Sequence, residues 1–125
     1  MDRSTKADSL RAKVTELTAA LPEATANPAG NHLSLEVRGK RFGWFLDDHH
    51  DDGRIAINCK ATKGVNQSLA GAVPQSYHIP KYVGHHGWVG LWLDVDEVDW
   101  SDVAELLKEA YRLTAPKGLV TILDD

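Results

Sequence analysis

A chain of 125 residues is the size of one domain and can bury a continuous core without disulfides or a structural metal. Its 14 Lys and Arg against 18 Asp and Glu give a net charge of −4, the reverse of the balance expected of a domain that neutralises many phosphates. The single Cys59 excludes an internal disulfide, and no apolar run approaches the roughly 20 residues that span a bilayer. We therefore expect one domain, residues 1–125, outside the membrane. Because the first residues are polar, without a signal-peptide core, we expect it in the cytoplasm.

The N-terminal segment has the pattern of an amphipathic helix. Apolar residues recur at spacings of three and four from Leu10 to Leu21, which predicts a helix over residues 7–21. Asp8 or Ser9 is the expected N-cap, and Pro22 ends the helix. Residues 23–30 are rich in Ala, Asn, Pro and Gly and are typical of a loop.

Three strands are predicted next. Residues 33–37 alternate apolar and polar, a hairpin turn at Gly39 and Lys40 follows, and residues 41–46 return. After the polar loop 47–53, a third strand over residues 54–60 places Ile55, Ile57 and Cys59 on one side. The pattern predicts an antiparallel meander.

The second half adds two helices and a strand. Residues 64–72 have helical spacing and stop before Pro74, and residues 87–93 are apolar and aromatic enough for a strand. Asp99 or Ser101 caps a final helix that Pro116 closes. The predicted fold class is α+β, a twisted antiparallel sheet with the N- and C-terminal helices packed on one face.

Several motifs extend over nearly the whole chain after the first helix. They are Gly-Lys-Arg-Phe at 39–42, Asp-His-His-Asp-Asp-Gly-Arg at 48–54, Cys-Lys-Ala at 59–61 with Gly64, Tyr-Val-Gly-His-His-Gly-Trp-Val-Gly-Leu at 82–91, Trp100, and Tyr-Arg-Leu-Thr-Ala-Pro-Lys at 111–117. With these motifs the chain resembles the MmcQ/YjbR family. The resemblance implies a frataxin-like (CyaY-like) α+β fold and a description as DNA-binding. It implies no established reaction, catalytic residue or cofactor.

Basic residues at the first hairpin are the candidates for contact with DNA. Arg38, Lys40 and Arg41 would form a wing that touches phosphates, assisted by Lys60 and Lys117, which match the family's motifs. The alternative is that these charges protect an exposed hairpin against edge-to-edge association, and the net acidity favours that alternative.

A second hypothesis is a small-molecule site in a cleft between sheet and helices. Tyr82, His86 and Trp88 would lie at its rim, where the flanking glycines let the backbone approach a ligand. The alternative is a structural role, in which Gly84 and Gly87 allow a tight turn and the tryptophans belong to the core.

Metal binding and catalysis are the remaining classes. His49 and His50 have the residue type of a metal site, but adjacent residues of an extended segment point opposite ways, so further ligands would be needed. Cys59 is expected to be buried and inert, and no catalytic motif occurs. We expect a non-enzymatic binding protein with DNA or a small molecule as partner. The sequence leaves the oligomeric state open.

Overall fold

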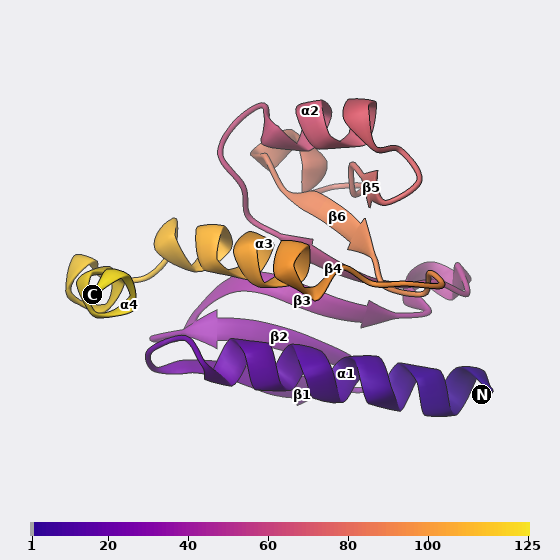
Figure 1. Cartoon of the computed structure of the whole chain (residues 1–125), viewed down its shortest axis with the longest axis horizontal. Coiled ribbons are helices and arrows are strands. Elements are labelled where there is room, and N and C mark those ends of the chain that lie inside the picture. The colour runs from indigo at the N-terminus through magenta and orange to yellow at the C-terminus, as the bar shows by residue number, and fades with distance from the viewer. Residues whose placement is uncertain (1) are drawn as a thin grey trace.

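The computed structural model describes residues 2–125 and contains one six-stranded sheet with its helices around it (Figure 1). Every strand pair is antiparallel, and the order across the sheet is β1-β2-β3-β4-β6-β5. Along the chain the elements are α1 (Arg3–Ala19), β1 (Ala24–Ala29), β2 (His32–Val37), β3 (Lys40–Asp47), the 3-10 turn η1 (His49–Asp51), β4 (Ile55–Cys59), α2 (Val65–Ala72), β5 (Tyr77–His78), the 3-10 turn η2 (Gly84–His86), β6 (Val89–Trp92), α3 (Trp100–Arg112) and α4 (Lys117–Asp124).

One face of the sheet carries the hydrophobic core. Helices α1 and α3 both contact this sheet and each other, and alternate residues of the strands point toward them. Tyr111 of α3 is fully buried, packs edge-on against Phe42, and donates a hydrogen bond from its hydroxyl to the carbonyl oxygen of Pro22 at 2.7 Å. This bond joins the last turn of α3 to the end of α1. The predicted α+β class, with both helices on one face, is confirmed.

The first helix begins earlier than its apolar pattern indicated. Asp2 is the N-cap, and its carboxylate accepts a hydrogen bond from the Thr5 backbone N–H at 2.9 Å. The expected cap at Asp8 or Ser9 is therefore wrong, since both residues lie inside the helix. The periodicity failed here because residues 3–6 are polar and contribute nothing to the buried stripe.

Residues 24–29 form the edge strand β1, whereas the composition predicted a loop. Only Ala24 and Ala26 are half-buried against the core and the other residues are exposed, so the strand exists largely through its pairing with β2 from Ala24↔Val37 to Ala29↔His32. Pro28 is tolerated because an edge strand needs hydrogen bonds on one side only.

The C-terminal region contains one more helix than the sequence predicted. Asp99 caps α3 as expected, accepting hydrogen bonds from the N–H groups of Ser101 and Asp102. Pro116 does not end this helix but begins a further one, α4, because proline is well suited to a helix start. Helix α4 buries Leu119 and is tied to α3 by the ion pair between Arg112 and Asp124 at 2.8 Å.

The predicted strands β2, β3, β4 and β6 and helix α2 are confirmed within one or two residues. Strand β5 has two residues and was not predicted, since so short a strand has no periodicity of its own. Within residues 2–125, no helix is both long enough and apolar enough to cross a bilayer.

Candidate ligand-binding cavity

The second face of the sheet, opposite the core, presents two rows of cross-strand neighbours. The register places Trp44, Asn58, Gly90 and His78 in one row and Leu46, Ala56 and Trp92 in the next. The residues in the middle of these rows are small or polar, and the tryptophans flank them. The surface between the aromatic side chains is therefore formed by short side chains, and we call this surface the floor.

A cavity of about 580 Å³ lies over this floor, and we call it the open-face cavity. The segment after β5 forms one wall, and the loop around η1 forms the other. Its lining consists of His32, Trp44, Leu46, His49, His50, Asp52, Arg54, Ala56, Asn58, His78, Ile79, Pro80, Lys81, Tyr82, Val83 and Trp92. The apolar lining is interrupted by a small number of polar groups, which is the composition of small-molecule sites.

Trp92 is held between two side chains from the neighbouring strands. The His78 ring stacks on it with centroids 3.8 Å apart and an interplanar angle of 19°, and the Arg54 guanidinium carbon lies 3.9 Å from its ring centroid. Because His78 lies on β5 and Arg54 directly precedes β4, the two approach Trp92 from opposite sides. The Trp92 ring is thereby fixed in one orientation.

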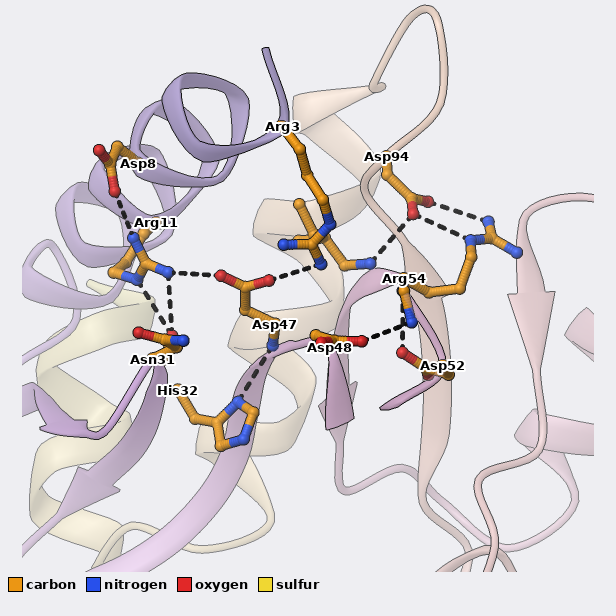
Figure 2. A network of polar contacts seen from close by, with 12 residues as sticks. Arg3, Asp8, Arg11, Asn31, His32, Asp47, Asp48, Asp52, Arg54 and Asp94 are labelled. Carbon is orange, nitrogen blue, oxygen red and sulfur yellow. Dashed lines mark hydrogen bonds and ion pairs between the residues drawn. The ribbon is translucent and has the colours of Figure 1, made fainter. Parts of the chain in front are cut away.

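Arg54 is itself clamped by Asp94 (Figure 2). Its Nε and Nη2 each donate to an Asp94 carboxylate oxygen at 2.9 Å, and the Ile55 N–H donates to the same carboxylate at 3.0 Å. Burial raises the pKa of Asp94, but the hydrogen bonds from Arg54 and Ile55 outweigh it and leave that pKa below its usual value. Asp94 is thus ionised and neutralises most of the charge that Arg54 brings to the cavity.

Trp44 forms the opposite side, and a β-bulge sets its surroundings. Pairing of β2 with β3 shifts by one residue at Phe42, so Arg41 and Trp44 share a face although they are three residues apart. The Arg41 guanidinium carbon lies 4.1 Å from the Trp44 centroid, and its Nε donates to Ser34 Oγ on β2 at 2.8 Å. Arg41 therefore covers the side of Trp44 toward β2 and leaves the side toward β4 to the cavity.

Two polar atoms in the floor have no hydrogen-bond partner in the protein. Asn58 is only 8% exposed, and its Oδ1 is unpartnered among the described residues. The Nδ1 of His78, two strands away in the same row, is in the same condition. A buried polar group without a partner costs about 1–3 kcal/mol, so this arrangement demands an explanation.

Several residues at the cavity and in the adjacent η1 loop have unusual backbone conformations. Asp48, His50 and Asp51 around η1 all have positive φ, and Tyr82 on the other wall has φ of 68°. Tyr82 is 76% exposed, and its ring faces that of His50 with centroids 6.3 Å apart. Left-handed conformations of non-glycine residues cost about 1–3 kcal/mol each and gather at functional sites.

A partly buried ion-pair network holds the start of the η1 loop. Figure 2 shows Asp47, the last residue of β3, between Arg3 and Arg11 of α1, with oxygen to nitrogen distances of 2.7 and 2.9 Å. The Asp47 backbone N–H donates to Nδ1 of His32 at 3.0 Å, which leaves the His32 Nε2 as the protonated nitrogen. Helix α1 thus fixes both the start of the η1 loop and one histidine of the lining.

The electrostatics keep two of the lining histidines neutral. Burial lowers the pKa of His78, and the nearby Arg54 lowers it further, against a smaller opposing effect of Asp52. Burial also lowers the pKa of His49, with contributions from His50 and His32. Near neutral pH these imidazoles offer one donor and one acceptor each rather than a positive charge.

A family model described as YjbR matches residues 19–113 of this sequence. The chain belongs to the YjbR family. A solved structure, that of the Deinococcus radiodurans protein DR2400 with family-model domain DUF419, is similar to this YjbR protein with a TM-score of 0.65 and 23% identity. The match covers 89% of this chain and 79% of that one. At this identity the likeness shows the fold. None of the curated proteins matches significantly.

Of the three ligand residues predicted from the sequence of this YjbR protein, one borders the cavity and two do not. Tyr82 lines the open-face cavity, whereas His86 and Trp88 do not. His86 is exposed in η2, and the carbonyl oxygen of Trp88 accepts a hydrogen bond from Asn66 at 3.0 Å. Gly84 and Gly87 serve the chain's own path. A Cβ on Gly84 would lie 2.4 Å from Ile79, and Gly87 has φ of 94°.

The basic candidates lie outside the open-face cavity. Arg38, in the left-handed region, is paired with Glu23 through hydrogen bonds of 2.6 and 2.8 Å, and Arg41 is held by Ser34 and Trp44. Lys40 begins β3 and is exposed, Lys60 directly follows β4, and Lys117 begins α4. The structure leaves the DNA role of all five as a prediction.

For His49 and His50, the expectation of opposed side chains is wrong. The loop is a 3-10 turn rather than an extended segment, and the two rings lie side by side with centroids 3.9 Å apart. Across residues 2–125, no group of three or more His, Cys, Asp or Glu side chains is arranged to hold a metal ion.

The sequence did not single out Asn58 as a site residue, and it did not bring His78, Trp44 and Trp92 together in one site. One signal was available, because Asn58 interrupts an otherwise apolar strand that is buried along its whole length. The residue types of His78, Trp44 and Trp92 did not indicate that they meet, because their proximity depends on β6 lying between β4 and β5.

Proposed function

We propose that this YjbR protein is a non-enzymatic small-molecule-binding protein and that the open-face cavity is its site. The observation that carries the proposal is Asn58, a nearly buried amide with an unpartnered Oδ1 in the floor of a 580 Å³ aromatic cavity. A ligand that hydrogen-bonds to this amide would remove the cost of leaving it unpaired.

The size and construction of the cavity support this proposal. Small-molecule sites commonly have volumes of about 300–1,000 Å³, with aromatic walls and a few placed polar groups. Trp92 and Arg54 are pre-positioned by stacking and by Asp94, so binding would not have to order them. The net acidity of the chain agrees better with such a ligand than with a polyanion.

The serine, threonine and cysteine nucleophiles of covalent catalysis have no counterpart in the cavity formed by residues 2–125. Among the described residues that line the cavity there is no Ser, Thr or Cys to act as a nucleophile. Cys59 belongs to the core on the other face of β4, and burial raises the pKa of its thiol to about 12. A thiol with this pKa stays protonated at neutral pH and is not a nucleophile.

Binding of DNA, which the family resemblance implies, is the alternative. It would use Lys40, Lys60 and Lys117, since Arg38 and Arg41 already have partners within the protein. Lysine contacts to phosphates would make the affinity fall steeply with salt, whereas a ligand in the open-face cavity would show little salt dependence.

An amide-shift NMR titration tests the proposal. Isotope-labelled protein would be titrated with a set of flat aromatic and heteroaromatic fragments, and separately with a short DNA duplex at low and near-physiological salt. We expect fragments to shift the indole N–H signals of Trp44 and Trp92 and the side-chain amide of Asn58. Absence of any fragment shift at these residues, with salt-sensitive DNA shifts at Lys40 and Lys117, would replace our proposal with the DNA alternative.

A further inference from the structure

The open-face cavity leaves room for a flat ring beside Trp44. Trp44 on β3 and Trp92 on β6 are separated by β4 alone and lie in neighbouring rows, so the strand spacing alone sets them at least about 9–10 Å apart. The β4 residues between them are Ala56 and Asn58, neither of which is large, and the space over Gly90 is filled by the His78 ring. A ring can therefore stand beside Trp44 above Ala56 and Asn58, while Trp92 keeps His78 and Arg54 on its own two faces.

Trp44 offers one face to this ring. Its side toward β2 is covered by Arg41, which is anchored to Ser34, and its side toward β4 borders the cavity. Stacked rings have centroids about 4.5–7 Å apart, and cross-strand neighbours have Cβ atoms about 4.5–5.5 Å apart. Since Asn58 is the cross-strand neighbour of Trp44, a ring stacked on Trp44 stands above Asn58 with one edge toward it.

The Asn58 amide specifies what that edge must carry. It presents one acceptor and two donor hydrogens side by side, and its last torsion turns easily, so either order of donor and acceptor can be met. The unpartnered Oδ1 is itself buried, so the amide would turn about its last torsion to accept a donor from the ligand, and its nitrogen would then meet an acceptor. An edge with adjacent donor and acceptor atoms satisfies both.

We infer that the ligand is a planar nitrogen heterocycle with a hydrogen-bond donor and acceptor adjacent on one edge, as in adenine or cytosine, stacked on Trp44 and recognised by the Asn58 amide. This inference rests on the proposed function of the open-face cavity. His78 contributes a second, neutral polar edge to the floor, one residue beyond Gly90 in the same row.

The test is a titration of tryptophan emission and heat of binding with adenosine, cytidine and guanosine, and with indole as a flat ring that lacks a donor–acceptor edge. We expect adenosine or cytidine to bind at least about tenfold more tightly than indole, since one bidentate pair gives discrimination of that order. Asn58→Leu, nearly isosteric but without polar atoms, should remove this preference and leave the indole affinity unchanged.

Asn58→Asp is expected to gain affinity for guanosine, a result that a misfolded variant would not give. A carboxylate presents two acceptors and no donor, so it should reject the edges of adenosine and cytidine and favour guanosine, whose edge has two adjacent donors. A thermal melt of each variant establishes that it is folded.

The outcomes distinguish failure of the heterocycle inference from failure of the proposed function. Indole binding as tightly as adenosine and cytidine, with both Asn58 variants unchanged, would overturn the heterocycle inference and leave a small-molecule site. Failure of all four probes to bind in the cavity of the folded wild-type protein would count against the proposed function itself.

Discussion

The imidazole ring of His78 occupies the space that a side chain on Gly90 would fill. A Cβ built on Gly90 would lie 2.2 Å from both Nε2 and Cε1 of His78, closer than real Cβ atoms come to any neighbour. The ring can lie flat against Trp92 only because its cross-strand neighbour has no side chain. Gly90 thus sets the floor of the open-face cavity although it does not border it.

Replacing Gly90 by Ala should displace His78 and loosen the Trp92 stack. Overpacking of this kind costs about 1–3 kcal/mol, and we expect a decrease of that order in the free energy of unfolding, measured by chemical denaturation. Ligand binding should weaken as well, because the floor is rebuilt.

Gly71→Ala in α2 is the matched control. A Cβ there meets nothing within 4 Å, and this helical glycine has no positive φ. We expect no decrease in stability, or a gain of about 0.4–1 kcal/mol, with binding unchanged. Equal effects of the two substitutions would contradict the role of Gly90.

The neutral state of His78 predicts a dependence of stability on pH. Burial and Arg54 hold the His78 pKa in the folded protein below its unfolded value of about 6.5, so the unfolded state takes up protons first as the pH falls. Stability is therefore expected to decrease as the pH drops below about 6.5. His49, whose pKa is also lowered, should add to the decrease in the same direction.

His78→Gln isolates this contribution. Unfolding free energies of wild type and variant measured at about pH 7.5 and 5.5 should show a smaller drop in the variant, because one of the titrating groups is gone. Identical drops would mean that His78 is not held neutral in the folded state.

Trp44 should report ligand binding, whereas Trp100 should not. Trp44 borders the open-face cavity, while Trp100 begins α3, packs against the core and lies under Lys13. We expect Trp44→Phe to lose most of the ligand-induced change in emission and Trp100→Phe to retain it. A signal carried by Trp100 would place the ligand on the helical face instead.

The basic residues provide a test of the DNA alternative. Neither Lys40 nor Lys117 lines the cavity, so the double variant Lys40→Ala/Lys117→Ala should bind nucleosides as the wild type does. If the chain binds DNA through these lysines, the same variant should lower the slope of log affinity against log salt by about 0.9 for each phosphate that is no longer neutralised. Lys6→Ala/Lys108→Ala, on α1 and α3, changes the net charge equally and serves as the control.

Cys59 should react only when the protein unfolds. It is fully buried, and burial raises its pKa to about 12. At neutral pH a reagent therefore cannot reach the sulfur, and the thiol is not ionised to the reactive thiolate. We expect a thiol reagent to modify the native protein slowly and the denatured protein at once. Rapid modification of the native protein would show that the sheet opens more readily than its packing indicates.

The sequence by itself determined the elements with strong periodicity and the core face of the sheet. Leu33, Leu35 and Val37 alternate on one strand, and Ile55, Ile57 and Cys59 on another, and all six are buried. The sequence predicted Asp99 or Ser101 as the cap of α3, and the structure shows that it is Asp99, which directly precedes the helix. Local patterns suffice for these features since burial on one face imposes a period on the chain.

Tertiary structure alone decided the edge strand β1, the short strand β5 and the open-face cavity. The cavity unites Trp44, Asn58, His78 and Trp92, whose proximity follows from the position of β6 between β4 and β5 and from the bulge at Phe42. Strand order and register are set by pairing between distant segments, which no local period encodes. Asn58 is recognisable in the sequence as a polar exception within an apolar strand. The cavity that it lines is formed by distant segments, so only the fold shows it.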